Sequence, residues 1–293
     1  MTTKILQHST RAYLADLVAL IKVRQTALLV ITGLCAYLLS AESASLHEAS
    51  LMALALFLAV SGCTVLNMLL DRDIDGQMDR TALRPLPAGR LSIGETLLFG
   101  SSMTIAGLAL AFGLDVRFGS IILAGLAFDL LVYTLWLKRI SPLSIIFGGI
   151  AGGMPALAGR VLAVGKIDLI GLLLAGAILL WIPSHILTLA MRHEDDYKNG
   201  GIPAWPLVYG HHSTRVFIAV ATLLNAIVLT GCGLLLDIHY ASLIILAGMS
   251  AVMIALSAYQ IARPTEKRNW LLFKLASMYM LFSVICLTVG ANL

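Results

Sequence analysis

Charged residues are scarce in this sequence: Asp, Glu, Lys and Arg make up 12% of its 293 residues. Soluble domains carry about twice that fraction, so these residues are too few to cover a water-exposed surface. Hydrophobic residues account for 59%, and the mean hydropathy is +0.92. The shortage of charge therefore excludes an ordinary soluble domain and indicates a polytopic membrane protein. The formal net charge of +4 is not a sign of nucleic-acid binding in such a chain.

Paired cysteines are also lacking. The four cysteines lie in apolar segments without any paired spacing: Cys35, Cys63, Cys232 and Cys286. Neither a disulfide framework nor a metal site is suggested, and we expect small buried side chains. A cleavable signal peptide is not indicated, because the polar N-terminus leads into a long span without a small-residue cleavage site.

Long apolar runs are abundant. A bilayer core needs roughly 20 apolar residues per helix, and the sequence predicts an all-α protein with about nine such spans. We place the spans at residues 18–40, 49–70, 94–114, 117–137, 142–163, 168–190, 215–236, 241–262 and 270–291.

The basic residues predict how these spans are oriented. If the N-terminus and the loops after spans 2, 4, 6 and 8 share one side, that side carries 17 of the 20 Lys and Arg residues. The positive-inside rule makes this side cytoplasmic. We therefore expect a protein of the cytoplasmic (inner) membrane, with its N-terminus and charged loops in the cytoplasm.

A glycine cluster in the fifth span has two interpretations. The segment "FGGIAGGMP" contains Gly148, Gly149, Gly152 and Gly153. Small residues allow helices to approach closely. The alternative is that they leave room for a flat or long ligand.

The densest charge follows the second span, in "NMLLDRDIDGQMDRTALRPLPAGR" (67–90). Asn67, Asp71 and Asp75 are spaced i, i+4, i+8 and share one face of a helix; Asp79 continues the series less well. Carboxylates one turn apart repel each other unless a cation binds between them. The group is therefore either a solvated helix end or a Mg²⁺ site, since Mg²⁺ prefers a few carboxylates plus substrate phosphates. The arginines that follow suit phosphate oxygens: Arg72, Arg80 and Arg84.

A second acidic group, Glu194, Asp195 and Asp196, follows the sixth span. Basic residues again lie nearby: Arg192, Lys198 and Arg215. Each acidic group follows an even-numbered span and precedes a proline-containing stretch. This pattern predicts one domain, residues 1–293, with a weak repeat (about 18–137 and 142–262, plus a final helix 270–291). Two facing groups could hold two Mg²⁺ ions around one diphosphate.

Two ionisable residues are predicted to lie inside spans. His185 lies in the sixth span and Asp129 in the fourth. Ionisable groups at such depth are candidates for a functional role, although a packed, hydrogen-bonded core residue is the alternative for each.

With these residues in hand, the chain resembles the UbiA superfamily of intramembrane prenyltransferases. The superfamily pattern N-x-x-x-D-x-x-x-D is met by Asn67, Asp71 and Asp75. The run "DRDIDGQMDRTALRPLPAGR", the segment 133–155 and "DDYKNGGIPAWPLV" resemble its haem-farnesylating branch. The likeness extends from about residue 14 to residue 220, and it implies that the helices form a UbiA-type bundle with a central cavity.

The resemblance implies Mg²⁺-dependent transfer of a farnesyl group from farnesyl diphosphate to a vinyl group of haem b. It implies catalytic roles for Asn67, Asp71, Asp75, Asp195 and Asp196, with Asp71, Asp75 and Asp196 as metal ligands. Diphosphate binding would fall to Lys22, Arg80, Arg84, Arg192 and Lys198, and acceptor binding to His185 and Asp129.

Two other functions remain open on the sequence alone. Another UbiA-type acceptor would be an aromatic or quinone precursor. A secondary transporter would also show buried charge and internal repeats, although transporters usually place that charge near the bilayer midplane.

Overall fold

The structure is a computed structural model that describes residues 10–293, and within these residues it is helical without β-strands. The elements, in chain order, are α1 (Thr10–Leu20), α2 (Val23–Leu38), α3 (Leu46–Leu70), α4 (Arg72–Asp75), α5 (Ile93–Leu114), α6 (Val116–Ala127), η1 (Phe128–Trp136), η2 (Leu137–Arg139), α7 (Ser144–Val164), α8 (Leu169–Ile182), η3 (Pro183–Leu187), α9 (Thr188–Arg192), α10 (Glu194–Asn199), α11 (Trp205–Leu235), α12 (Tyr240–Ala262) and α13 (Glu266–Ala291). The predicted all-α class is confirmed.

Several helices begin at a residue whose side chain satisfies the free N–H groups of the first turn. Ser92 and Glu95 form a reciprocal capping box at the start of α5. Asp168 accepts a hydrogen bond of 2.8 Å from the Gly171 N–H at the start of α8. Thr265 caps α13 in the same way. The polar residues between the apolar runs therefore fix where the helices start.

Eight helical segments in the described part of the chain are long and apolar enough to cross a membrane, and a bent pair supplies a ninth. The nine predicted spans are confirmed, with two corrections. The first, predicted as continuous over 18–40, is broken into α1 and α2, which meet at 47°. The seventh, predicted to start at 215, starts at Trp205 and bends at Gly210, where φ is +74°.

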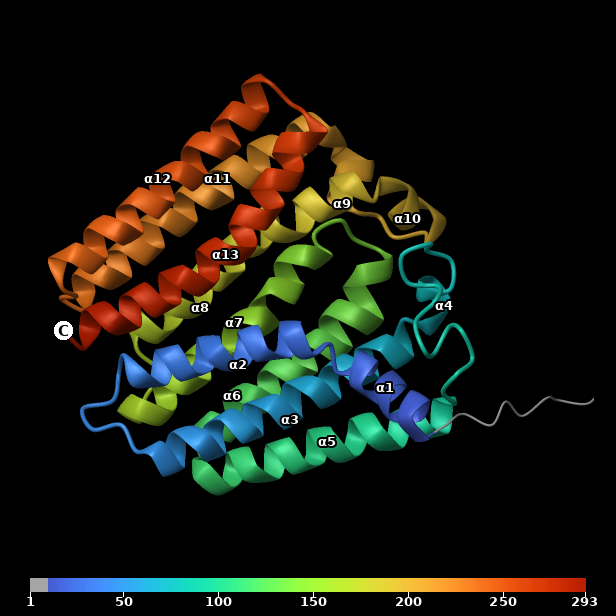
Figure 1. The fold of residues 1–293 in the computed structure, drawn as a ribbon, viewed down its shortest axis with the longest axis horizontal. Coiled ribbons are helices and arrows are strands. Elements are labelled where there is room, and N and C mark those ends of the chain that lie inside the picture. Colours follow the sequence, from blue (N-terminus) through green and yellow to red (C-terminus); the bar gives the residue numbers. More distant parts are fainter. Residues whose placement is uncertain (1–9) are drawn as a thin grey trace, which may run out of the picture.

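Spans that follow one another in the sequence pack together, α3 with α5, α7 with α8, and α12 with α11 and α13, and α7 also packs against α2 (Figure 1). The last helix, α13, meets α2 of the first span, where the Thr288 hydroxyl lies 3.2 Å from the Cys35 carbonyl oxygen. Glycines allow the closest approaches. A Cβ on Gly159 would lie 2.1 Å from the Gly33 carbonyl oxygen, so α2 and α7 touch backbone to backbone.

The glycine cluster of the fifth span serves close packing in this structure. A Cβ on Gly153 would lie 2.6 Å from the Ala175 carbonyl oxygen of α8, and one on Gly149 would lie 2.6 Å from the Leu179 side chain. Neighbouring helices occupy the space beside these glycines, which favours the close-packing interpretation over the one that leaves room for a ligand.

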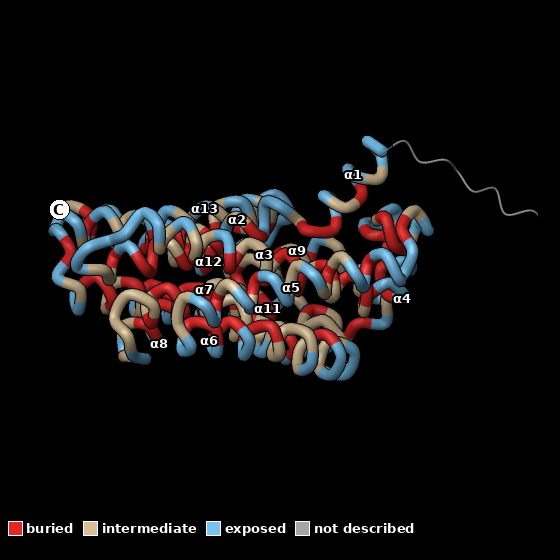
Figure 2. The backbone as a smooth tube through the Cα atoms, turned by 90° about the horizontal axis from the view of Figure 1, so that it is seen from below, coloured by how far each residue is buried: buried red, intermediate tan, exposed pale blue. Residues whose placement is uncertain are grey.

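Large apolar side chains cover the outside of the bundle as well as its interior. Leu98, Ile105 and Ile244 are 73%, 66% and 66% exposed. Figure 2 shows the buried residues along the inward faces of the helices and the exposed residues along the outward faces. Such a surface suits hydrocarbon and is unfavourable in water, so the protein is an integral membrane protein. The four cysteines are free thiols.

Candidate active site

The first acidic group lies where α3 ends. The Asp71 N–H donates to the Asn67 carbonyl at 2.9 Å, and the Asp75 N–H donates to the Asp71 carbonyl at 2.8 Å. The helical register therefore continues past Leu70 into α4, and the three residues follow one another by single turns, as predicted. Asp71 is 3% exposed and Asp75 is 5% exposed. These two carboxylates do not belong to a solvated helix end.

The two carboxylate oxygens of Asp71 have different surroundings. One oxygen, Oδ2, is ion-paired with Lys138 of η2. The other, Oδ1, is buried and has no hydrogen-bond partner among the described residues. A buried carboxylate oxygen without a partner is costly, so this atom marks a place where a cation or a donor can bind.

Asp75 is paired with Arg84, whose guanidinium lies 2.6 Å from Oδ2. The loop between α4 and α5 is held in place by Thr81, whose hydroxyl donates to the Asp75 carbonyl at 2.8 Å. Lys22 lies at the break between α1 and α2, with a left-handed φ of +43°. It is close enough to Asp75 and Arg84 for a direct electrostatic interaction. The broken first span thus brings a cation to the carboxylates.

The second acidic group is joined to the first through Asp196. Its Oδ1 accepts a hydrogen bond of 2.9 Å from the Asp79 N–H, and Arg80 Nε lies 3.8 Å from its Oδ2. His193 lies 3.7 Å from the same oxygen. Burial and then the positive charge of Arg80 lower the pKa of His193, so its imidazole is neutral at pH 7. The predicted meeting of the two groups therefore occurs.

The apolar side chains beneath this junction hold it together. Ile74, Met78 and Ile202 form a small buried cluster, with Tyr197 packed against it. Figure 1 shows α4 and α10 side by side at one end of the bundle. We call this region, residues 71–90 together with 193–203, the charged end.

Other residues of the two groups point elsewhere. Asp73 is exposed and forms a bidentate pair with Arg139, with N–O distances of 2.7 and 2.8 Å. Glu194 pairs with His211 at 2.8 Å. Burial thus separates Asp71, Asp75 and Asp196 from their acidic neighbours, a distinction that the sequence alone does not make.

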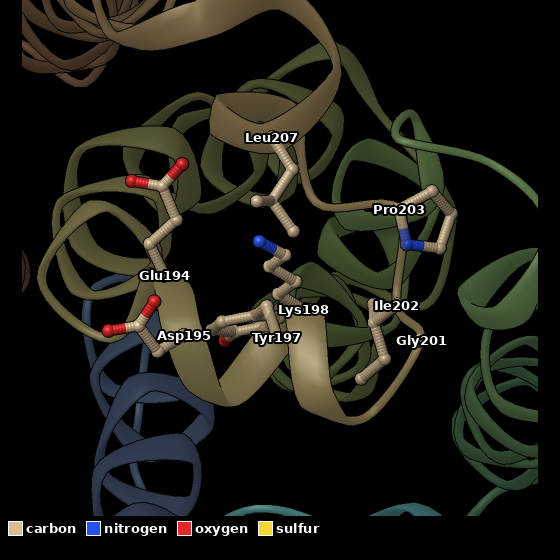
Figure 3. Close-up of a pocket in the computed structure, with 8 residues that line it drawn as sticks. All are labelled: Glu194, Asp195, Tyr197, Lys198, Gly201, Ile202, Pro203 and Leu207. Atoms are coloured by element: carbon tan, nitrogen blue, oxygen red, sulfur yellow. The ribbon is translucent and has the colours of Figure 1, made fainter.

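Asp195 and Lys198 line a surface pocket of about 420 Å³ formed by residues 194–207. Figure 3 shows the carboxylates of Glu194 and Asp195 on one side of it, Pro203 on the other and the Lys198 amine between them. The residues that line it do not include Asp71, Asp75 or Asp196. The predicted roles of Asp195 and Lys198 at the carboxylate centre stay predictions.

His185 lies in a wide turn of the sixth span. Pro183 lacks an N–H, and the helix relaxes to a π-helical turn over η3, a feature that is often found at functional sites. The His185 ring stacks between Trp181 and Phe273, with centroid distances of 4.8 Å on both sides. Its Nδ1 lies 3.0 Å from the Ser277 hydroxyl.

The Ser277 hydroxyl also donates to the Phe273 carbonyl at 2.8 Å. A hydroxyl has one proton, so Ser277 accepts from Nδ1–H when it donates to that carbonyl. The Nε2 atom of His185 is then left with a lone pair.

Asp129 lies in the π-helical segment η1 and accepts a hydrogen bond of 3.3 Å from the Cys63 thiol. In the same segment, Thr134 donates to the Asp129 carbonyl at 2.7 Å and accepts from the Asn67 amide at 2.6 Å. The Asn67 side chain is therefore committed to η1. Asn67 positions this helix against α3, and Cys63 has a polar partner that its apolar setting did not suggest.

Two residues at the centre were not predicted as site residues. Lys138 pairs with Asp71, and Thr134 holds Asn67. Lys138 has a weak signal in the sequence, since "KR" follows the fourth span, but basic residues at the ends of spans are also explained by the positive-inside rule. Nothing in the sequence distinguishes Thr134 from other threonines in spans.

The residues fit a Mg²⁺ ion held together with a substrate. Asp71 Oδ1 is buried and unpartnered, and Asp75 follows one helical turn later. No group of three or more His, Cys, Asp or Glu side chains within residues 10–293 is arranged to hold a metal. Mg²⁺ commonly takes one or two carboxylates, with water and substrate phosphates completing its octahedron. The described donor set matches that pattern.

The fold and this site together define a polytopic, all-α membrane protein with a buried ionic centre at one end of its bundle. The chain belongs to the UbiA prenyltransferase family, whose sequence model matches residues 28–283. It is accordingly a prenyltransferase, and the transporter alternative is not retained.

Curated relatives extend over most of the chain. A protoheme IX farnesyltransferase of Archaeoglobus fulgidus is 39% identical over 280 residues, which cover 96% of this chain and 99% of the relative. Enzymes of the same name from Korarchaeum cryptofilum and Thermofilum pendens are each 42% identical, over 73% and 77% of this chain and 72% and 81% of their own lengths.

Solved structures share the fold at lower identity. A structure of digeranylgeranylglyceryl phosphate synthase gives a TM-score of 0.79 at 22% identity and covers 95% of this chain and 98% of its own. A UbiA homologue from Archaeoglobus fulgidus, bound to GPP and Mg²⁺, gives 0.65 at 16% identity and covers 93% of this chain and 99% of its own.

Proposed function

We propose that this protein transfers a farnesyl group from farnesyl diphosphate to a vinyl group of haem b. The observation that supports this most strongly is the junction of Asp71, Asp75 and Asp196 with cations from three separate parts of the chain. The names of the curated relatives support the choice of substrates. The charged end would then bind the diphosphate, and the apolar bundle would hold the prenyl chain and the porphyrin.

In this reaction the allylic C1–O bond of the donor breaks, and its electron pair leaves with the diphosphate. Mg²⁺, when bound, supplies a Lewis acid that neutralises charge on the leaving group. Arg84 and Arg80 are placed to stabilise the same developing charge through their guanidinium N–H groups. Lys22 and Lys138 add two further cations beside Asp75 and Asp71.

The farnesyl cation is attacked by the π-electrons of the vinyl group, and a C–C bond forms at C1. The cation that results beside the porphyrin is captured by water, which then loses a proton and leaves a hydroxyl group. Early capture of the farnesyl cation by water must be prevented. The apolar residues that line the bundle beneath the charged end would exclude that water.

His185 would bind the acceptor. The lone pair on Nε2 suits a haem iron, because a neutral imidazole is a metal ligand. Ser277 and the flanking rings of Trp181 and Phe273 hold the imidazole in one orientation. Asp129, whose carboxylate accepts a hydrogen bond from the Cys63 thiol, would bind the acceptor as well.

We further propose that the charged end faces the cytoplasm, in the inner membrane. The basic residues that flank the spans support this orientation through the positive-inside rule.

The proposed reaction is tested by incubating purified protein in lipid with haem b and a panel of prenyl diphosphates, followed by mass spectrometry. We expect a product carrying a hydroxyethylfarnesyl group, release of diphosphate, and loss of both on addition of EDTA. Transfer to an added aromatic or quinone precursor, with haem b untouched, would show that the acceptor assignment is wrong.

A further inference from the structure

A second polar pocket lies outside the carboxylate centre, at the same end of the bundle. Its volume is about 250 Å³, and it lies between the ends of α9, α11, α12 and α13. The residues that line it are Met191, Arg192, His211, Arg215, Gln260, Pro264, Thr265, Glu266 and Asn269. Of these residues only Arg192 was given a role by the sequence, toward the diphosphate.

The pocket contains a hydrogen-bond donor and a positive charge that an anion could pair with. Arg192 is paired with Glu266 at 3.0 Å, whereas Arg215 has no ion pair among the residues that the structure describes. The Nε atom of Arg215 is buried and has no hydrogen-bond partner there. The two arginines outnumber the single carboxylate of Glu266, so the lining carries a net positive charge. A buried guanidinium donor without a partner is costly unless a ligand supplies an acceptor.

The pocket is connected to His185 by a continuous stack of rings. The Arg192 guanidinium lies 4.4 Å from the centre of the Trp270 ring. Trp270 stacks on Phe273 at 4.7 Å, and Phe273 stacks on His185 at 4.8 Å. The interplanar angles are 11° and 17°, so these rings are nearly parallel.

This geometry sets the direction of a porphyrin bound to His185. The bond from Nε2 to an iron lies in the plane of the imidazole, and the porphyrin lies roughly perpendicular to that bond. The stack axis is perpendicular to the rings and therefore lies in the porphyrin plane. A porphyrin on His185 would extend along the edges of Phe273 and Trp270, with one side directed at Arg192.

We propose that this pocket binds the propionate carboxylates of the haem acceptor through Arg192 and Arg215. The proposal rests on the function proposed above, and it assigns Arg192 to the acceptor in place of the diphosphate. Arginine forks match carboxylate geometry in a bidentate fashion. Holding the carboxylates at this end would fix which edge of the porphyrin faces the carboxylate centre, so the pocket would determine which vinyl group is modified.

The test compares haem b with its dimethyl ester, in which both propionates are neutral. Binding is followed by the Soret band of the purified full-length protein in phospholipid-free detergent. We expect the wild-type protein to bind haem b about 10- to 100-fold more tightly than the ester, since hydrogen bonds between charged groups contribute about 1.5–3 kcal/mol. In the double variant Arg192→Gln/Arg215→Gln, the ratio of the affinity for haem b to the affinity for the ester should fall close to one.

Two controls make the result specific. Arg263→Gln removes an exposed arginine that does not line the pocket, and it should keep the wild-type ratio. Binding of an unreactive farnesyl thiodiphosphate should be unchanged in the double variant. If the double variant no longer binds the analogue but still prefers haem b over the ester as wild type does, Arg192 binds the donor diphosphate and the proposal is wrong.

The result can be separated from a failure of the proposed function. If haem b is farnesylated but the double variant keeps the wild-type ratio, the pocket assignment is wrong and the reaction stands. If no haem is farnesylated, the proposed function fails. A further arm adds anionic phospholipid to the binding assay. If the lipid weakens binding of haem b and of the ester equally in the wild-type protein, and has no such effect in the double variant, the pocket is a lipid headgroup site.

Discussion

Asp196 accepts a hydrogen bond of 2.9 Å from the backbone N–H of Asp79, a residue 117 positions away in the sequence. This bond joins two loops that follow different spans and places three buried carboxylates at one end of the bundle. Each of these carboxylates has a basic partner: Lys138 for Asp71, Arg84 for Asp75 and Arg80 for Asp196. Charge of both signs is therefore concentrated where a metal and a diphosphate would meet.

We expect Asp71→Asn and Asp75→Asn to lower the rate of farnesyl transfer by about 100-fold or more, because each removes a charge that would hold Mg²⁺. The matched control is Asp73→Asn, a carboxylate in the same segment that is exposed and paired with Arg139. Its rate should stay near wild type. Initial rates at saturating Mg²⁺ check this, and near-normal turnover in both buried variants would remove these residues from the metal site.

We expect Arg84→Lys to raise the KM for farnesyl diphosphate about 10-fold, because lysine keeps the charge and loses the planar fork. Arg90→Lys is the control, since Arg90 pairs with Asp16, 3.0 Å away, outside the carboxylate centre. Steady-state kinetics with varied donor distinguish the two. An unchanged KM and kcat in Arg84→Lys would indicate that Arg84 serves only to hold Asp75.

We expect His185→Ala to weaken haem binding about 10-fold or more, seen as a lost or shifted Soret band, while a farnesyl diphosphate analogue still binds. The reason is that His185 lies within the sixth span, stacked between Trp181 and Phe273, and is not one of the residues of the charged end. Ser277→Ala, which removes the partner of Nδ1, should shift the band with a smaller loss of affinity. Loss of analogue binding with an unchanged haem spectrum would reverse the assignment.

The ion pair of Asp73 predicts how the stability of the fold depends on pH. Its hydrogen bonds with Arg139 hold its pKa at about 2. A carboxyl whose pKa is lower in the folded state than in the unfolded state, where it is about 3.9, stabilises the fold above that unfolded value. This contribution is lost as the pH falls from about 4 to about 2. Because both side chains are largely exposed, it amounts to about 0.2–1 kcal/mol.

Unfolding in detergent at pH 7 and at pH 2.5 measures this contribution. Asp73→Asn should be slightly less stable than wild type at pH 7, and the difference should shrink at the lower pH. A difference that grows as the pH falls would contradict the sign of the pKa shift.

Asp168 should matter for stability and not for transfer. The Arg160 guanidinium lowers the pKa of Asp168, and the same carboxylate caps α8 through the Gly171 N–H. We expect Asp168→Ala to lower the free energy of unfolding by about 2 kcal/mol, because it removes the cap and leaves Arg160 unpaired. Asp168→Asn keeps the cap and should lose less. Normal transfer rates at low temperature in both variants would confirm a structural role.

Much of this architecture is determined by the sequence alone. Long apolar runs can satisfy their backbone hydrogen bonds in a bilayer only as helices, so the nine spans and the all-α class follow from hydropathy. The register of Asn67, Asp71 and Asp75 follows from helical spacing. The capping residues Ser92 and Asp168 mark helix starts because their side chains accept the free N–H groups of the first turn.

Other features required the tertiary structure. The break at Lys22 and the π-helical turns around Asp129 and His185 depend on how neighbouring helices pack, and local composition gives little sign of them. Burial separated Asp71 and Asp75 from Asp73, three carboxylates within five residues, because only their three-dimensional surroundings differ.

The partners of the ionic centre were also decided only by the fold. Lys138 meets Asp71 and Asp79 meets Asp196 across large separations in sequence. A hydrogen bond or an ion pair acts over a few ångströms, and many pairings of a few acids with a few bases are equally compatible with one composition. The tertiary structure selects among them: burial of Ile74, Met78 and Ile202 in one cluster holds the loop after α4 against the segment around α10, where Asp79 meets Asp196.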